Sequence, residues 1–428
     1  MLNWHVFQPI QLINPVLCMS GAIRFKLSFM MFLEFFIWGA WFVTLGTFLG
    51  KNLSATGAEM SNIFGTQSWG AIIAPFIVGL IADRYFNAER ILGVLHLVGA
   101  GLMYMMYKSG TAGEFFPYVL GYMILFMPTL ALVNSISFRQ LSDPEKQFSG
   151  IRIWGTIGWI VAGLAISFFS WDSAEAIEGG MLRNTFLMAS VVSVILGVYS
   201  FLLPATPPVK AGDSSQSSVS DILGLDALKL LKDRNFLIFF LSSVLICIPL
   251  AFYYQNANPF LAEIGMGNPT AKMTIGQASE VLFLLALPVF FKRFGFKNTI
   301  LLAMLAWALR YLLFAYGNAG DLSFMLLLGI ALHGICYDFF FVAGQIYTDA
   351  KAGEKYKSAA QGLISLATYG VGMLIGFWAA GLISDSYVAL KETDISLFWQ
   401  KVWIIPAGIA FAVMLLFLLL FKNEKVES

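Results

Sequence analysis

Three charged residues, Glu280, Arg310 and Asp338, each lie well inside a long apolar stretch of the chain. At the ~1.5 Å rise of a helical residue, each lies ~17 to 20 Å from the charged residues that end its stretch. In a hydrocarbon core of ~30 Å, all three would lie near the midplane. A charge there costs at least ~2.5 to 3.5 kcal/mol, so it is normally retained only where it faces protein or a wet cavity. We therefore predict a polar site at the middle of a membrane.

The composition identifies the class of protein. The 428 residues are 58% hydrophobic and 12% charged, with 40 Phe and 11 Trp, which excludes an ordinary soluble globule. The chain is therefore expected to be all-α and polytopic, with twelve transmembrane helices. The expected spans are Leu27–Leu49, Ile63–Ala82, Ile91–Tyr107, Phe116–Phe138, Ile153–Trp171, Leu182–Leu203, Phe236–Tyr254, Met273–Phe291, Thr299–Gly317, Leu322–Thr348, Ser358–Ser384 and Val402–Phe421.

Basic residues indicate how the chain crosses the membrane. Of the 26 Lys and Arg residues, Arg152 and Arg310 lie within spans. If the N-terminus is inside, eighteen of the others face the cytosol and six face outward. Because cytoplasmic loops are enriched in Lys and Arg, we predict that both termini are cytoplasmic, in a cell (inner) membrane. The net charge of +1 gives no sign of a nucleic-acid partner, because the bias in the basic residues is a topology signal, and we expect none.

The longest polar stretch, Pro204–Ser220, falls halfway along the chain and is typical of a linker. The apolar residues that follow it recur at helical spacing, which predicts an amphipathic helix on the inner membrane surface or, alternatively, a continuation of the linker. The expected organisation is a cytosolic extension (1–24), a six-helix half (25–203), a cytosolic linker with the amphipathic helix (204–235), a second six-helix half (236–422) and a cytosolic tail (423–428).

Residues typical of catalysis are missing from the sequence. Three His and three Cys have no metal-ligand spacing, and there is no nucleophile elbow or phosphate-binding loop. We expect no enzyme activity, no metal and no cofactor. An integral-membrane enzyme or a receptor is correspondingly disfavoured.

Six helices, a linker and six helices is the plan of the major facilitator superfamily, whose halves rock about a midplane site. The segment Gly79-Leu-Ile-Ala-Asp83-Arg84 resembles the inner-loop signature of that superfamily, which makes Asp83 and Arg84 candidate gating residues. The basic loop Lys292–Lys297 occupies the matching position in the second half. The alternative for an Asp-Arg pair at a helix end is an anchor or a cap.

Several dispersed motifs more closely resemble the bacterial nucleoside:proton symporter family within that superfamily. They are Trp38-Gly-Ala-Trp41, Met127-Pro-Thr-Leu-Ala-Leu-Val-Asn134, Ile151-Arg-Ile-Trp-Gly-Thr-Ile-Gly158, Gly224-Leu-Asp-Ala227, Ala306-Trp-Ala-Leu-Arg310, Phe314-Ala-Tyr-Gly317 and Tyr337-Asp-Phe-Phe340. The resemblance covers both halves. It implies the import of nucleosides such as uridine by proton symport through alternating access. The alternative is a permease of the same fold for a sugar or another small polar solute, because a fold does not specify a substrate.

The resemblance also implies which residues bind the substrate: Arg152, Thr156 and Trp159 on the fifth helix, Gln277 and Glu280 on the eighth, and His333 and Tyr337 on the tenth. These side chains suit a nucleoside, whose base can stack on aromatic rings and whose ribose hydroxyls suit a carboxylate or a guanidinium. On the seventh helix, Ala251 and Tyr254 stand where the family has Gln and Asn, so the contacts are lost or are replaced by Gln255, Asn256 or Asn258.

Several polar and aromatic residues of the spans also have a simpler interpretation. Arg152 could be an interfacial anchor that extends its charge to the membrane surface. His333 could be a hydrogen-bonded packing residue, and Tyr337 could serve packing alone. Glu34 on the first helix is either a polar group of the cavity or part of a helix contact.

Proton coupling is assigned to Glu280, Asp338, Arg152 and Arg310. We expect Arg310 to form a structural pair with Asp338, since the ninth helix is peripheral in this superfamily. One acid would then lack a partner in the second half, and burial favours the protonated form of an unpaired carboxylate. Arg152 of the first half could compensate that acid in one conformation and release it in another. We expect a monomer whose partners are the nucleoside, the proton and the lipid bilayer.

Overall fold

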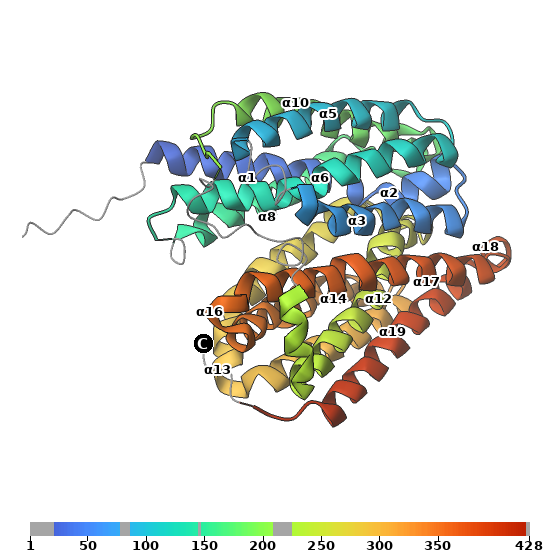
Figure 1. Ribbon diagram of the computed structural model, residues 1–428. Coiled ribbons are helices and arrows are strands. Elements are labelled where there is room, and N and C mark those ends of the chain that lie inside the picture. The colour runs from blue at the N-terminus through green and yellow to red at the C-terminus, as the bar shows by residue number, and fades with distance from the viewer. Residues whose placement is uncertain (1–20, 78–85, 144–146, 209–224, 425–428) are drawn as a thin grey trace, which may run out of the picture.

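A computed structural model describes residues 21–77, 86–143, 147–208 and 225–424 of the chain. Within these residues all regular structure is helical. Two bundles lie one above the other (Figure 1). The first contains α1 (Gly21–Phe42), α2 (Leu45–Thr47), the π-helical η1 (Phe48–Asn52), α3 (Gly57–Ile77), α5 (Ala88–Lys108), α6 (Ala112–Gln140), α8 (Ser149–Phe168), α9 (Ala174–Glu178), the 3-10 turn η3 (Met181–Arg183) and α10 (Asn184–Ser200).

The second bundle follows the linker. It contains the 3-10 segment η4 (Leu225–Lys232), α12 (Arg234–Glu263), α13 (Pro269–Tyr316), α14 (Ser323–Ala331), α15 (His333–Tyr337), the π-helical η5 (Asp338–Val342), α16 (Ala343–Ser365), the π-helical η6 (Leu366–Gly372), α17 (Met373–Ser386), α18 (Leu390–Thr393) and α19 (Ile395–Leu420). Several of these helices begin at a side chain that accepts a backbone N–H, such as Thr111 before α6 and Asp394 before α19.

Ten helical segments of the described residues are long and apolar enough to cross a membrane. One of them, α13, is 48 residues long, and its backbone leaves the helical conformation at Gly295, where φ is +73°. Glycine adopts such a conformation without steric cost, so α13 can contain two consecutive spans. Together with α3, which is cut by the residues outside the description, these segments are consistent with the twelve spans expected from the sequence.

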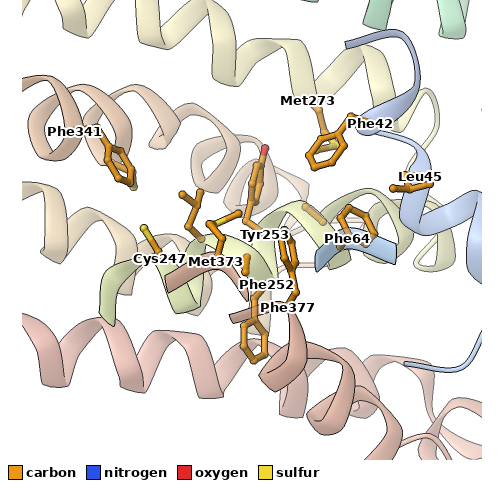
Figure 2. Packing of buried hydrophobic residues seen from close by; sticks show 14 of the residues in the cluster. Phe42, Leu45, Phe64, Cys247, Phe252, Tyr253, Met273, Phe341, Met373 and Phe377 are labelled. Carbon is orange, nitrogen blue, oxygen red and sulfur yellow. The ribbon is translucent and has the colours of Figure 1, made fainter. Parts of the chain in front are cut away.

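The two bundles meet at one end, which we call the distal face because it lies away from the start of α1 and the end of α19 (Figure 1). It includes η1, the start of α3, the ends of α8, α12 and α17, and the start of α13. Figure 2 shows buried side chains where the bundles pack together. The rings of Phe64 and Phe377, from opposite bundles, have centroids 5.4 Å apart, and those of Phe42 and Tyr254 are 5.7 Å apart.

The segment η4 lies where the sequence predicted an amphipathic helix after the linker. Its eight described residues form a 3-10 helix that packs on α16. Ala227 is completely buried there, in a small cluster with Ala352, Ala360 and Leu363. Its small side chain lets the segment approach α16 closely, which the hydrophobic period alone did not indicate. Residues 209–224 of the expected linker lie outside the described residues.

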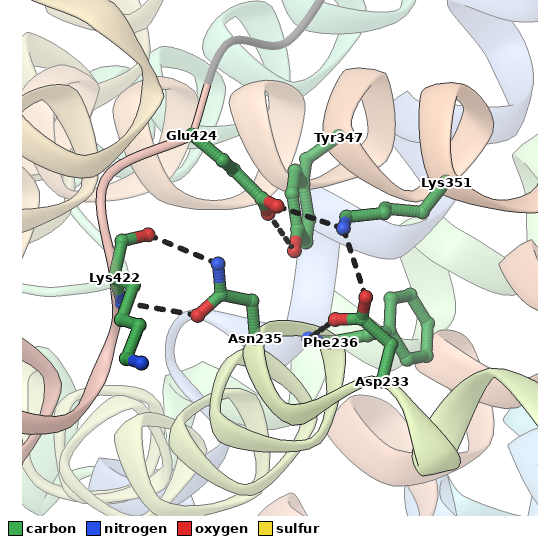
Figure 3. A network of polar contacts seen from close by, with 7 residues as sticks. All are labelled: Asp233, Asn235, Phe236, Tyr347, Lys351, Lys422 and Glu424. Carbon is green, nitrogen blue, oxygen red and sulfur yellow. Dashed lines mark hydrogen bonds and ion pairs between the residues drawn. The ribbon is translucent and has the colours of Figure 1, made fainter.

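A polar network ties the start of α12 to α16 and to the end of the chain (Figure 3). Lys351 forms ion pairs with Asp233 (3.1 Å) and Glu424 (2.8 Å), and Asp233 caps α12 by accepting the N–H of Phe236. Burial alone would raise the pKa of the Asp233 carboxyl. The hydrogen bonds from Phe236 and Lys351 outweigh burial, so the pKa is below its usual value. The network is thus most favourable when Asp233 is ionised.

Candidate transport site

A small cavity of about 20 Å³ lies between the bundles. The first bundle contributes Trp159 and Gly163 of α8 to its wall, while Tyr253 and Tyr254 of α12 and Gln277 of α13 come from the second. The other lining residues are Phe42, Val43, Thr270, Met273 and Thr274. A volume of this size holds about one water molecule. A larger ligand can enter only if the bundles move apart.

Trp159 and Gln277, both expected at the substrate site, thus line one cavity from opposite bundles. Trp159 packs edge-on against Trp38 of α1, with ring centroids 5.5 Å apart. The Oε1 atom of Gln277 is buried and has no hydrogen-bond partner among the residues that the structure describes. A buried amide oxygen in this condition costs free energy, which a ligand with a hydrogen-bond donor would recover.

Arg152 and Thr156 lie on the same helix, α8, and both are partly buried. The Arg152 guanidinium stands over the ring of Phe35 of α1, with its Cζ atom 4.1 Å from the ring centroid. Arg152 is also close enough to Glu280 of α13 for their charges to interact across the two bundles. Arg152 thus lies against a ring of its own bundle and within electrostatic range of a carboxylate of the other bundle.

Arg310 does not form the pair with Asp338 that the sequence suggested. Its Nη1 atom donates to His333 Nδ1 at 3.0 Å, and its Cζ atom lies 3.5 Å from the ring centroid of Tyr253. The Nε and Nη2 atoms have no partner within the described residues. The prediction was wrong because a guanidinium can also be held by a ring face and a neutral imidazole, and depth in the membrane does not distinguish these partners from a carboxylate.

The contact with Arg310 fixes the hydrogen on the His333 ring. A guanidinium only donates hydrogen bonds, so His333 Nδ1 must accept and the hydrogen of the neutral imidazole must be on Nε2. His333 Nε2 lies 4.0 Å from Glu280 Oε2, slightly too far for a hydrogen bond. Arg310, His333 and Glu280 thus form a row, in which Arg310 donates to His333 and the Nε2 atom of His333 lies 4.0 Å from the carboxylate of Glu280.

Asp338 lies one residue after α15, at the first position of the π-helical turn η5. It is 1% exposed, and its Oδ2 atom has no hydrogen-bond partner in the described part of the chain. Asp338 and Glu280 are close enough to interact electrostatically. Two acids therefore share the interior of the second bundle, and π-helical turns are often found at functional sites.

Tyr337 connects this region to the eleventh span. Its hydroxyl lies 2.6 Å from the hydroxyl of Tyr369, which belongs to the π-helical η6. Its ring stacks on His333, with centroids 5.8 Å apart. These contacts place Tyr337 between the Arg310–His333 row and η6, where it can position His333.

Comparisons with known proteins agree with this arrangement. A model of the family described as "Nucleoside H+ symporter" matches residues 21–426. The chain belongs to the nucleoside:proton symporter family. It is 43% identical to the putative nucleoside transporter YegT of Escherichia coli K12 over 94% of both chains, and 34% identical to the xanthosine permease of the same organism over 94% of this chain and 96% of that protein.

A solved relative supports the same fold. The crystal structure of the nucleoside transporter NupG superimposes with a TM-score of 0.83 at 29% identity, covering 94% of this chain and 100% of that one. The peptide transporter PepTSo superimposes with a TM-score of 0.71 at 15% identity, which supports the fold alone. The symporter therefore has the major facilitator fold expected from its sequence, and its family comprises membrane transporters rather than enzymes.

The seventh span of this symporter, α12, carries polar side chains close to the cavity. Tyr254 lines the cavity, whereas Ala251 packs away from it, against Gly376 of α17. The side-chain amide of Gln255 is fully buried, and neither of its polar atoms has a partner among the described residues. Asn258 is already engaged, since it accepts from Thr47 at 2.5 Å. Asn256 is also buried, and its Nδ2 atom likewise lacks a partner among the described residues, so Gln255 and Asn256 can both gain a ligand, whereas Asn258 connects the bundles.

The sequence did not reveal a buried cluster inside the first bundle. Glu34 of α1 contacts His96 Nε2 of α5 at 2.8 Å and accepts from Thr129 of α6 at 2.6 Å. Glu34 was left open between a cavity group and a helix contact, and the structure shows the helix contact. Asp83 and Arg84, the expected gating residues, lie outside the described residues.

Proposed function

We propose that this chain imports nucleosides together with protons, by alternating access across the cell (inner) membrane. Membership of the nucleoside:proton symporter family carries the proposal. The cavity supports it, because Trp159 of the first bundle and polar side chains of the second, such as Gln277, line it together. With both termini in the cytoplasm, as the basic residues suggest, the packed distal face is the outer one. The described conformation is then closed to the outside.

The units that move are proposed to be the two six-helix halves, residues 25–203 and 236–422. Because the cavity holds about one water molecule, its walls must separate for a nucleoside to enter. One chain supplies every wall, so a monomer suffices for transport. Asp83 and Arg84 remain candidates for a gate at the cytoplasmic face.

We assign the substrate contacts by chemistry. Trp159 offers a ring face for the base, while the unpartnered amide oxygen of Gln277 can accept from an N–H or O–H of the nucleoside. Glu280 suits the ribose hydroxyls, because a carboxylate accepts two hydrogen bonds at once. Arg152, Thr156, His333 and Tyr337 complete the proposed site.

The coupling of protons is proposed to depend on Glu280 and Asp338. His333 cannot take up a proton while Arg310 donates to its Nδ1 atom, which leaves Glu280 and Asp338 as the proposed proton carriers of the second bundle. Arg152 approaches Glu280 from the opposite bundle, and this interaction changes whenever the bundles separate. Protonation of Glu280 would weaken its attraction to Arg152 and so link the proton to the motion. Arg310 is proposed to act through His333, which it orients so that the Nε2 atom is on the side of Glu280.

Uptake of labelled uridine and adenosine by cells lacking their own nucleoside permeases tests the function. We expect saturable uptake that a protonophore abolishes and that unlabelled nucleosides, but not sugars, compete with. Sugar-sensitive uptake would favour a permease for another solute. Uptake that continues after collapse of the proton gradient would overturn symport.

A further inference from the structure

Two carboxylates at the distal face reach across from one bundle to the first turn of a helix in the other. Asp172, just after α8 in the first bundle, accepts the N–H of Thr270 at the start of α13 at 3.1 Å. Asp385, at the end of α17 in the second bundle, accepts the N–H groups of Gly57 and Ala58 at the start of α3, at 2.7 and 3.0 Å. Each bundle thus caps a helix of the other.

The chemistry of a helix start makes both contacts favourable. The first backbone N–H groups of a helix have no partner within the helix, and the helix dipole attracts negative charge to that end. At the first contact, Ser167 extends the cap by donating to Asp172 at 2.6 Å and accepting the N–H of Ala271 at 3.0 Å. Asp172 is 3% exposed, so this contact is shielded from water.

The two contacts occupy equivalent positions in the two halves. Asp172 follows the fifth span and caps the eighth, whereas Asp385 ends the eleventh span and caps the second. The fifth span of the first half corresponds to the eleventh span of the second half, and the eighth corresponds to the second, so exchanging the two halves converts one contact into the other. The helices also approach closely at both places: a Cβ atom at Gly381 would lie 2.2 Å from the Gly57 carbonyl oxygen, and one at Gly163 would lie 2.9 Å from Thr274.

We propose that Asp172 and Asp385 form a reciprocal clasp, which holds the distal face closed and must release both helix starts before that face can open. The clasp rests on the alternating access proposed above. It adds two positioning residues, Asp172 and Asp385, that determine which face is open. In the open state, water replaces both carboxylates at the helix starts. The contacts therefore stabilise only the conformation in which the distal face is packed.

The test measures how often the distal face opens. Val43 lines the cavity, so in a background with Cys18, Cys247 and Cys336 replaced by Ala, Val43→Cys reports access. Full-length protein in oriented vesicles is exposed to a membrane-impermeant maleimide confined to the side of the distal face. Because the labelling rate follows the open fraction, it remains informative even when that fraction is small. No nucleoside is needed, so failure of this test is distinct from failure of the transport assay.

We expect Asp172→Ala and Asp385→Ala each to accelerate labelling about fivefold, the typical effect of losing one N-cap, and the double variant to accelerate it about 25-fold. Asp394→Ala is the matched control, because Asp394 caps α19 by accepting the N–H of Leu397 at 2.9 Å within its own bundle. It should leave the labelling rate unchanged. Equal acceleration by the control, or a folded double variant that labels at the parental rate, would overturn the clasp.

A milder pair of variants covers the case in which the double variant does not fold. Ser167→Ala removes one donor to Asp172 and the acceptor of the Ala271 N–H, while Asp385→Asn keeps an oxygen but loses the charge. Each should accelerate labelling by a smaller factor than the corresponding Ala variant of the carboxylate. Parental rates in both would likewise contradict the proposal.

Discussion

Replacing Asp338 by Asn separates two accounts of the charges in the second bundle. If Asp338 were the ionic partner of Arg310, the change would leave a buried cation unpaired, at a cost of about 3 to 5 kcal/mol. The structure instead shows that Arg310 donates to His333 and stacks on Tyr253, and that Asp338 Oδ2 has no hydrogen-bond partner in the described part of the chain. We therefore expect Asp338→Asn to change the free energy of unfolding by less than about 1 kcal/mol, since no hydrogen bond or ion pair to Oδ2 is lost.

Variants of His333, the observed partner of Arg310, provide the contrast with Asp338→Asn. His333→Phe removes the acceptor of Arg310 Nη1, and a hydrogen bond to a charged group contributes about 1.5 to 3 kcal/mol. His333→Asn is the matched control, because the Asn oxygen can stand close to the position of Nδ1. We expect Asp338→Asn to be the most stable of these variants and His333→Phe the least stable, with His333→Asn between them.

The assay is thermal unfolding of the purified proteins in one detergent, followed by tryptophan fluorescence. Nucleoside affinity measured on the same samples separates folding from binding. The reasoning is refuted if Asp338→Asn melts as low as His333→Phe. That result would mean that Asp338 and Arg310 are paired in the protein in solution.

Three further changes have definite expected outcomes. Glu280→Gln should weaken nucleoside binding by about five- to tenfold in detergent, because a charge-assisted hydrogen bond is about twice as strong as a neutral one; unchanged affinity would remove Glu280 from the ribose site. Gly381→Ala should accelerate maleimide labelling of Val43→Cys, because the added Cβ atom would collide with Gly57 and Ser61 of the other bundle. A parental labelling rate would show that α3 and α17 can adjust without opening the distal face. Asp233→Asn should lower the melting temperature more at pH 7 than at pH 3. The Asp233 carboxyl has a depressed pKa in the folded state, so its contribution is fully present above the unfolded pKa of about 4 and decreases as pH falls toward the lower folded value. An equal loss at both pH values would contradict that sign.

The class of fold could be predicted from the sequence because it depends on properties of single segments. Apolar runs of spanning length indicate membrane helices, since every backbone polar group must be satisfied within the helix. The expected spans Met273–Phe291 and Thr299–Gly317 placed a break where Gly295 interrupts α13, but the apolar pattern did not indicate that only one residue leaves the helical conformation there. The 3-10 segment η4 likewise depends on its contact with α16.

The candidate site was predictable in part, and the reason differs between residues. Trp159 and Gln277 were found by their resemblance to the family and lie together at the cavity. The partner of Arg310 was not found, because three candidate groups lie at similar depth and only the three-dimensional packing selects His333. The contacts of Asp172 and Asp385 leave no pattern in the sequence either, since each joins segments about 100 or more residues apart.

Nucleoside uptake by purified protein in liposomes, driven only by an imposed pH gradient, tests the central claim most directly. With the liposome lumen more alkaline than the medium, we predict that labelled uridine or adenosine accumulates above its external concentration, and that a protonophore dissipates the accumulated label. Equilibration at the external concentration, with or without the gradient, would contradict proton-coupled nucleoside symport.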